Sequence, residues 1–243
     1  MRALLLRGML AGLIAATLAT VFAYAVGEPP VNAAIGLEDA GSGHDHHHST
    51  EPVSRGVQST IGLFTGVGVY GIAIGGLLAV AFALVYGRLG TLRAGPTALL
   101  LTGAAFVAAV LVPFLKYPAN PPAVGSPDTI GARTGLYFGF VALSVVFAMA
   151  AAVAGRQVSR RRDAASGALV GVAGYVVPAG AAVWLMPTVN EIPDGFPAAV
   201  LWDFRIASLG TQVVLWGVLG VVFGLLTRRA LNARGAAPAV TAH

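Results

Sequence analysis

The chain has 243 residues, of which 56% are hydrophobic and only 10% are charged, and its formal net charge is +5. Soluble domains usually contain about 25% charged residues, so this composition excludes an ordinary soluble domain and indicates an integral membrane protein. The chain has no cysteine, which excludes disulfides and thiolate metal sites.

Six apolar segments are each long enough to cross a bilayer as a helix, which needs about 20 residues. They contain no Asp, Glu, Lys, Arg or His, so hardly any polar face is left to meet water. The segments are residues 8–26, 63–86, 97–115, 135–154, 168–186 and 206–227. We predict an all-α integral membrane protein, a six-helix transmembrane bundle that forms a single domain over residues 1–243.

The first apolar segment has two interpretations. Arg2 and Arg7 precede an apolar run that ends near Ala23-Tyr24-Ala25, a pattern typical of a signal peptide with an A-x-A cleavage site. The run is longer than the core of about 7–15 residues that signal peptides usually have. We therefore favour a retained helix, whereas cleavage would leave five spans.

Basic and acidic residues occupy alternate loops along the chain. One set of loops, residues 1–7, 87–95, 155–167 and 228–243, holds eleven basic residues and one acid. The other set holds four basic residues and nine acids. Positive charge marks the cytoplasmic side of a membrane protein, so we expect both termini in the cytoplasm. The basic net charge is then an orientation signal, and we predict no nucleic-acid partner.

The same rule places three loops on the outer face of the membrane. We describe them as a His-rich loop over residues 27–60, a Pro-rich loop over residues 116–134 and an acidic loop over residues 187–205. Several prolines in the second loop fix φ and remove amide donors, which predicts a rigid irregular segment rather than a helix.

Four of the five histidines lie in the His-rich loop, within the run GSGHDHHHST at residues 41–50. Neutral imidazole is the commonest protein ligand for late first-row divalent metals. The flanking Gly, Ser and Thr residues suit a flexible segment that folds around a metal when it arrives. We predict a metal site; the alternative is a disordered polar loop that binds metal only in vitro. The candidate ligands are His44, Asp45, His46, His47 and His48.

The acidic loop adds hard oxygen donors, because Glu191, Asp194 and Asp203 lie within thirteen residues. Their charge would attract a divalent cation, and we include all three as candidate metal ligands. The alternative is that these carboxylates pair with the basic residues of the same loops and hold the loops together. Those basic residues are Lys116, Arg133 and Arg205.

Glycines one helical turn apart recur in the apolar segments, and examples are Gly8 with Gly12 and Gly71 with Gly75. Small residues at this spacing let helix backbones approach closely in lipid. The spans contain no carboxylate for a proton or sodium relay. There is no phosphate-binding G-x-x-x-x-G-K-[ST] loop. We predict no nucleotide, no organic cofactor and no catalytic residue, so that a partner or the ion's own gradient drives any transport.

Several long motifs resemble the CbtA family of proposed cobalt transporter subunits. They are GEPPVNAAIGLEDA from residue 27, the His-rich run, KYPANPPAVGSPDTIGART from residue 116, VNEIPDGFPA from residue 189 and LWDFRIASLGTQ from residue 201. The resemblance covers nearly the whole chain. It implies a multi-pass protein of the bacterial inner membrane that serves cobalt uptake for corrinoid synthesis. It also implies a small partner similar to CbtB, with one span and a His-rich tail. For this chain itself the resemblance implies five spans, whereas we count six.

We therefore predict the membrane subunit of a cobalt or nickel uptake transporter, which captures divalent metal outside and passes it inward through the bilayer. Co²⁺ is the expected substrate, with Ni²⁺ and Zn²⁺ as alternatives because imidazole suits all three. The second hypothesis is a non-transporting scaffold or a metal-buffering accessory protein. An enzyme is the weakest reading, because no nucleophile–base pair or metal triad can be assembled from these residues.

Overall fold

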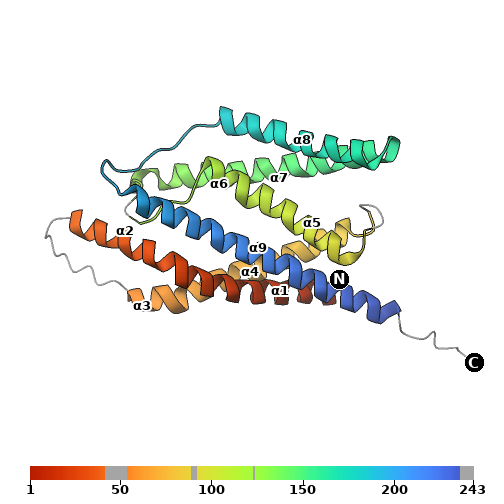
Figure 1. The fold of residues 1–243 in the computed structure, drawn as a ribbon, viewed down its shortest axis with the longest axis horizontal. Helices are drawn as coiled ribbons and strands as arrows, with labels where there is room; N and C mark the ends of the chain where they lie inside the picture. The colour runs from red at the N-terminus through yellow and green to blue at the C-terminus, as the bar shows by residue number, and fades with distance from the viewer. Residues whose placement is uncertain (42–53, 89–91, 123, 236–243) are drawn as a thin grey trace, which may run out of the picture. The chain divides into compact units, whose positions relative to one another are not determined.

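The computed structural model describes residues 1–41, 54–88, 92–122 and 124–235, and this part of the chain is helical apart from short connections (Figure 1). Six helices are long and apolar enough to cross a membrane, which confirms the predicted number and the all-helical class. They are Arg2–Ala40, Arg55–Val85, Ala94–Lys116, Pro127–Arg161, Ala164–Leu185 and Ala198–Ala233. By these helices the protein is a multi-pass membrane protein.

The chain divides into two compact units, each described here by itself. The first consists of Met1–Phe22, Val53–Gly103 and Val213–His243. It contains α1 (Arg2–Phe22), α3 (Arg55–Val57), the π-helical segment η2 (Gln58–Gly62), α4 (Leu63–Val85), most of α5 (Ala94–Phe106) and the second half of α9 (Ala198–Gly235).

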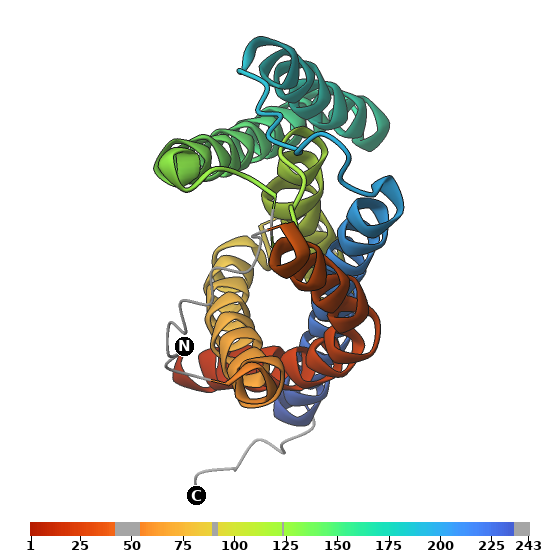
Figure 2. The same ribbon diagram turned by 90° about the vertical axis from the view of Figure 1, so that its left-hand side faces the viewer.

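Helices α1 and α4 lie side by side and touch through their backbones (Figures 1 and 2). Gly8 faces Gly75 and Gly12 faces Gly71, so the two helices run antiparallel. A Cβ atom added at Gly71 would lie 2.6 Å from the Gly12 carbonyl oxygen, too close for any real contact. Buried alanines extend this interface along both helices. Lipid provides no hydrophobic force between helices, so close packing of this kind supplies the attraction.

Larger side chains fill the rest of the first unit. Phe82 of α4 packs edge-on against Phe223 of α9, with ring centroids 5.3 Å apart. After α4 the chain reverses in a type II turn, in which Gly87 has φ +76° and the Arg88 amide donates to the Val85 carbonyl at 2.9 Å. Glycine adopts this φ without steric cost. The Arg88 guanidinium also donates to the Leu84 carbonyl at 2.8 Å, which caps the end of α4.

The second unit consists of Ala23–Pro52 and Ala104–Gln212. It contains the π-helical segment η1 (Ala23–Gly27), α2 (Glu28–Gly41), η3 (Val107–Leu111), α6 (Val112–Lys116), η4 (Pro127–Thr129), α7 (Ile130–Arg161), α8 (Ala164–Leu185) and the first half of α9.

Helices α7 and α8 form a tight antiparallel hairpin. A Cβ atom at Gly167 would lie 2.6 Å from the Gly155 carbonyl oxygen, so the two helices again meet at glycine. Asp163 caps α8, because its carboxylate accepts from the Ser166 amide at 2.9 Å and from the Ser166 hydroxyl at 2.6 Å. These bonds lower the pKa of the Asp163 carboxyl from its ordinary value. Further along the hairpin, the Ser144 and Tyr175 hydroxyls bond at 2.9 Å.

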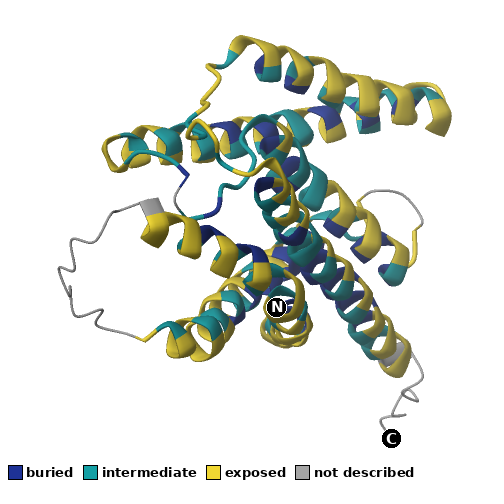
Figure 3. Cartoon of the chain, turned by 60° about the vertical axis from the view of Figure 1, so that its left-hand side comes forward, coloured by how far each residue is buried: buried dark blue, intermediate teal, exposed yellow. Residues whose placement is uncertain are grey.

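Most of α8 is exposed (Figure 3), and its exposed large side chains are apolar. The exposed large side chains include Leu169, Val172, Val177 and Leu185, all more than half exposed. In water such a surface would be unfavourable, whereas acyl chains cover it at no cost. The exposed apolar side chains therefore agree with a helix that lies in lipid.

The helices extend further into the predicted loops than the composition indicated. The first one is continuous over Arg2–Ala40, 39 residues or about 58 Å at 1.5 Å per residue, whereas the hydrocarbon core is about 30 Å thick. Residues 28–41 of the predicted His-rich loop therefore belong to α2, and residues 198–205 of the predicted acidic loop belong to α9. Polar residues do not stop a helix in water, which explains the difference.

In two of the long helices a π-helical segment precedes proline. Segment η1 comes just before Pro29 and Pro30, and η3 comes just before Pro113. Proline lacks an amide hydrogen, and its ring clashes with the carbonyl four residues earlier in a regular α-helix. A wider turn moves that carbonyl aside. The helix can then continue through the proline instead of ending there.

The glycine contact between α1 and α4 predicts a specific sensitivity. Replacement of Gly71 with leucine should push the helices apart and destabilise the protein by about 1–3 kcal/mol, because overpacking forces the backbone to shift. The matched control is Gly66→Leu in the same helix, since an added Cβ there meets nothing within 4 Å. The measurement is unfolding of the purified protein in mixed micelles. Equal stability of the two variants would contradict the proposed contact.

Candidate functional site

The second unit contains a cavity of about 510 Å³, within the size range of small-molecule sites. Its wall includes residues 117–120 and 124, which follow α6, and residues 189–192, which follow α8. Helix α7 contributes Arg133, Thr134 and Tyr137, and α9 contributes Arg205, Ser208 and Gln212. Residues three and four apart share one face of a helix. The polar residues of each helix therefore lie on one face toward the cavity, and on α7 they are accompanied by Ile130 and Phe138.

Two side chains from the end of α6 hold the segment after α8. The Lys116 ammonium group donates to the Met186 carbonyl at 2.8 Å, and the Tyr117 hydroxyl donates to the Pro187 carbonyl at 2.9 Å. The Tyr117 phenol is protonated at neutral pH and can act as the donor, and burial raises its pKa further from the ordinary value of 10.0. These bonds satisfy carbonyl groups at the end of α8 that no further helical turn could reach.

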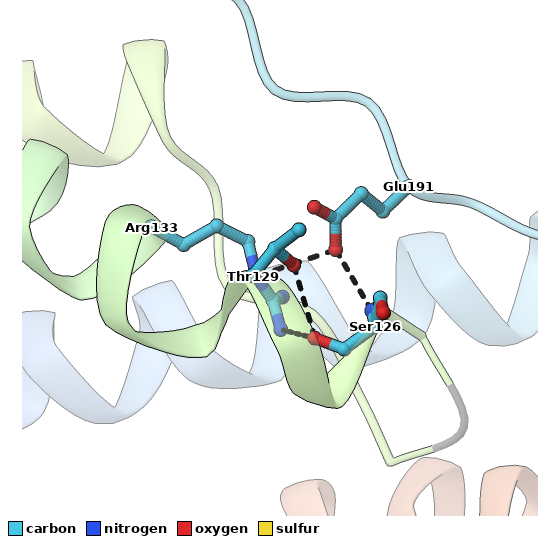
Figure 4. A network of polar contacts seen from close by, with 4 residues as sticks. All are labelled: Ser126, Thr129, Arg133 and Glu191. Atoms are coloured by element: carbon cyan, nitrogen blue, oxygen red, sulfur yellow. Dashed lines mark hydrogen bonds and ion pairs between the residues drawn. The ribbon is translucent and has the colours of Figure 1, made fainter.

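Glu191 ties the acidic segment to the start of α7 (Figure 4). Its carboxylate accepts from the Ser126 amide at 2.9 Å and lies 3.3 Å from Arg133 Nε in a half-buried ion pair. The Arg133 guanidinium also donates to the Ser126 carbonyl at 3.1 Å. The Thr129 hydroxyl lies in reach of both that carbonyl, at 3.0 Å, and the Glu191 carboxylate. The four residues form one connected network.

The network changes how Glu191 titrates. Hydrogen bonds from the Thr129 hydroxyl and the Ser126 amide, together with the charge of Arg133, lower the pKa of the Glu191 carboxyl from its ordinary value of 4.5. A carboxyl whose folded pKa is lowered stabilises the fold above its unfolded pKa. This stabilisation is lost only as the pH falls through the lower folded value. The network is therefore intact at neutral pH.

Arg205 reaches across the cavity wall to the Pro-rich segment. Its Nε donates to the Ala119 carbonyl at 3.3 Å, and one terminal nitrogen donates to the Asn120 side-chain oxygen at 2.9 Å. Both acceptors are neutral, and the guanidinium is half-buried. Within the described part of the chain, Arg205 forms no ion pair. Asp203 is exposed, and two residues along a helix correspond to nearly opposite faces.

The predicted metal ligands have different positions. His44, Asp45, His46, His47 and His48 lie outside the described residues. Glu191 is in the network above, whereas Asp194 and Asp203 are exposed. Among the described residues, no group of three or more His, Cys, Asp or Glu side chains is close enough to hold a metal ion. The metal site therefore stays a prediction.

The alternative role for the loop charges fits part of this geometry. Glu191 pairs with Arg133, as that alternative expected, but Lys116 and Arg205 bind carbonyl and amide oxygens instead. Sequence reasoning missed the cavity and the use of Asn120. One signal was present: Arg205, Ser208 and Gln212 make a polar stripe at helical spacing beside an apolar span.

The comparisons with known proteins give one match. The searches of curated proteins and of solved structures each found no match for this chain. A family model described as "Probable cobalt transporter subunit (CbtA)" matches residues 1–228. This match covers nearly the whole chain, including all six apolar helices up to residue 228. The chain therefore belongs to the CbtA family of probable cobalt transporter subunits.

Proposed function

We propose that this protein is the membrane subunit of a cobalt uptake transporter, with nickel as the alternative metal. The observation that carries the proposal is the family match over residues 1–228 of a chain with six potential membrane helices. The family name describes a subunit, and the proposed partner is a small His-rich membrane protein similar to CbtB. No enzymatic activity is part of this function.

The charge pattern supports a definite orientation for the proposed transporter. Eleven of the fifteen basic residues lie in the set of loops that includes both termini. By the positive-inside rule both termini face the cytoplasm, in the inner membrane of a bacterium. The His-rich run then faces outward, where its imidazoles capture the metal before it passes inward.

Of the three candidate carboxylates, Asp194 and Asp203 fit a role in attracting cations better than Glu191. Both are exposed, so an ion can approach them without disturbing the fold. Glu191 already accepts hydrogen bonds and faces Arg133 at 3.3 Å. An incoming cation would have to displace a guanidinium. We therefore retain Glu191 as a proposed metal ligand but expect its main effect to be on loop structure.

The engagement of Glu191 also favours a second candidate function. A charged loop residue that serves only the fold is expected in a scaffold or a metal-buffering accessory protein that passes no ion. In that case the His-rich run concentrates metal for a partner, and the partner contains the pathway. The two functions differ in whether the protein moves metal across a bilayer.

Replacement of His44, His46, His47 and His48 with alanine should lower cobalt uptake at limiting metal, because the imidazoles provide the capture site. The measurement is radioactive cobalt uptake into proteoliposomes that contain this protein, with and without the small partner. Uptake by the wild-type pair that exceeds empty vesicles supports transport. No uptake under either condition would favour the scaffold, and unchanged uptake in the variant would rule out the His-rich run.

A matched pair of variants distinguishes a structural role of Glu191 from a role in ion binding. If the carboxylate serves the fold, Glu191→Gln and Arg133→Gln should reduce thermal stability similarly, and the double variant should be no worse than either. Uptake should then follow stability in all three. If Glu191 binds the ion, Glu191→Gln should abolish uptake while Arg133→Gln retains it. Asp128→Asn is the control, because Asp128 is an exposed carboxylate that is not among the candidate metal ligands.

The orientation is checked with reporters that are active on only one side of the membrane. A periplasmic reporter inserted after Gly43 and a cytoplasmic reporter inserted at Arg161 should both be active, because the positive charges stay inside. The reversed pattern would contradict the outward His-rich run and the capture step with it.

A further inference from the structure

The cavity of the second unit has a net positive lining, whereas a site for a bare cation would have a negative one. Its described lining includes two guanidinium groups, Arg133 and Arg205, and a single carboxylate, Glu191. Glu191 is paired with Arg133, so these two charges largely cancel. The charge of Arg205 is left over. A divalent cation in this cavity would be repelled, whereas an anion would be attracted.

Arg205 also has donors to spare. A guanidinium carries five N–H donors in a planar fork. The structure uses one on the Ala119 carbonyl and one on the Asn120 side chain, both neutral acceptors. A half-buried positive charge without a carboxylate partner is costly. An oxyanion in the cavity would offset that cost and accept the remaining hydrogen bonds.

The surroundings of Arg205 suit a ligand larger than a single ion. Ser208 and Gln212 continue its face of α9, and Tyr137 of α7 also lines the cavity. Side chains that mix a cation, amide and hydroxyl groups with aromatic rings are typical of sites for small organic anions.

We propose that this cavity binds a ligand bearing carboxylate or phosphate oxygens, with the Arg205 guanidinium as its principal contact. Two sources can supply that chemistry: a small soluble polyanion and the headgroup of an anionic lipid. The inference stands on the cavity alone and does not depend on transport. If the proposed transport function holds, a metal bound to a polycarboxylate chelator is the form of cobalt that this cavity would accept.

The test is titration of the purified full-length protein with citrate and with inorganic phosphate, in nanodiscs of neutral phosphatidylcholine. Saturable binding is expected, and Arg205→Gln should weaken it about tenfold or more, since hydrogen bonds to charged groups are the strong ones. Arg205→Lys should recover part of the affinity because it keeps the charge. The control is Arg93→Gln, an exposed arginine far from the cavity in sequence, which should bind normally.

A second variant separates binding from support of the loop. Asn120→Ala removes the side-chain partner of Arg205 but leaves the guanidinium and its bond to the Ala119 carbonyl in place, so it should retain most of the affinity. Equal loss in Asn120→Ala and Arg205→Gln would overturn the proposal, because Arg205 would then act only as a structural tie. The absence of saturable binding to the wild-type protein, or unchanged binding in Arg205→Gln, would also overturn it.

Nanodiscs that contain phosphatidylglycerol identify the source of the anion. Competitive loss of citrate binding in these nanodiscs, dependent on Arg205, supports the oxyanion site and assigns it to a lipid headgroup. Retained binding supports the site and assigns it to a soluble anion. A protein that binds citrate through Arg205 but takes up no cobalt would refute the transport function alone. Uptake without any anion binding would refute this inference alone.

Discussion

Direct contact between helix backbones is the interaction on which the packing of this protein depends. In lipid, apolar side chains gain little by leaving one apolar surface for another, so association relies on close van der Waals contact. Glycine allows that contact where Gly12 meets Gly71 and where Gly155 meets Gly167. Both interfaces join helices that run antiparallel and are neighbours in the order of spans. Each compact unit is thus built around one glycine-rich helix pair.

Four charged residues of the second unit hold irregular chain in place, and they are Lys116, Arg133, Glu191 and Arg205. The segments after α6 and α8 are rich in proline and satisfy only some of their carbonyl groups with their own amides. Lys116, Arg133 and Arg205 supply the missing donors from neighbouring helices. Glu191 neutralises one of these cations. The cavity wall has two guanidinium groups and one carboxylate, so its net charge is positive. The two arginines are the donors that bind the loop carbonyl groups.

This arrangement places groups that attract cations and groups that attract anions in different parts of the chain. The imidazole-rich run and the exposed carboxylates can attract cations, whereas the cavity beside Arg205 favours anions. A metal that moves as a bare ion would bypass the cavity, and a metal that moves with an anionic chelator would use it. In the proposed transporter, the charge of a few side chains, rather than the apolar spans, would then determine which form of the metal is accepted.

Much of the fold was determined by the sequence alone. Hydrophobic runs of about 20 residues have few alternatives to a membrane helix, which is why the six spans were predicted correctly. The glycine spacing identified surfaces such as Gly8 and Gly12 that make close contacts. The helix ends were less certain, because composition does not show that a π-turn carries a helix through Pro29 and Pro30.

The candidate site depended on tertiary structure. The sequence showed that Glu191, Arg133 and Arg205 lie in or near loops, but it did not show their partners. Glu191 binds Ser126, 65 residues away, and Arg205 binds Ala119, 86 residues away. Pairing over such separations depends on which helices pack together and at what depth. A sequence pattern records neither, so only the folded chain decided that the Arg205 guanidinium would line the cavity without a carboxylate partner of its own.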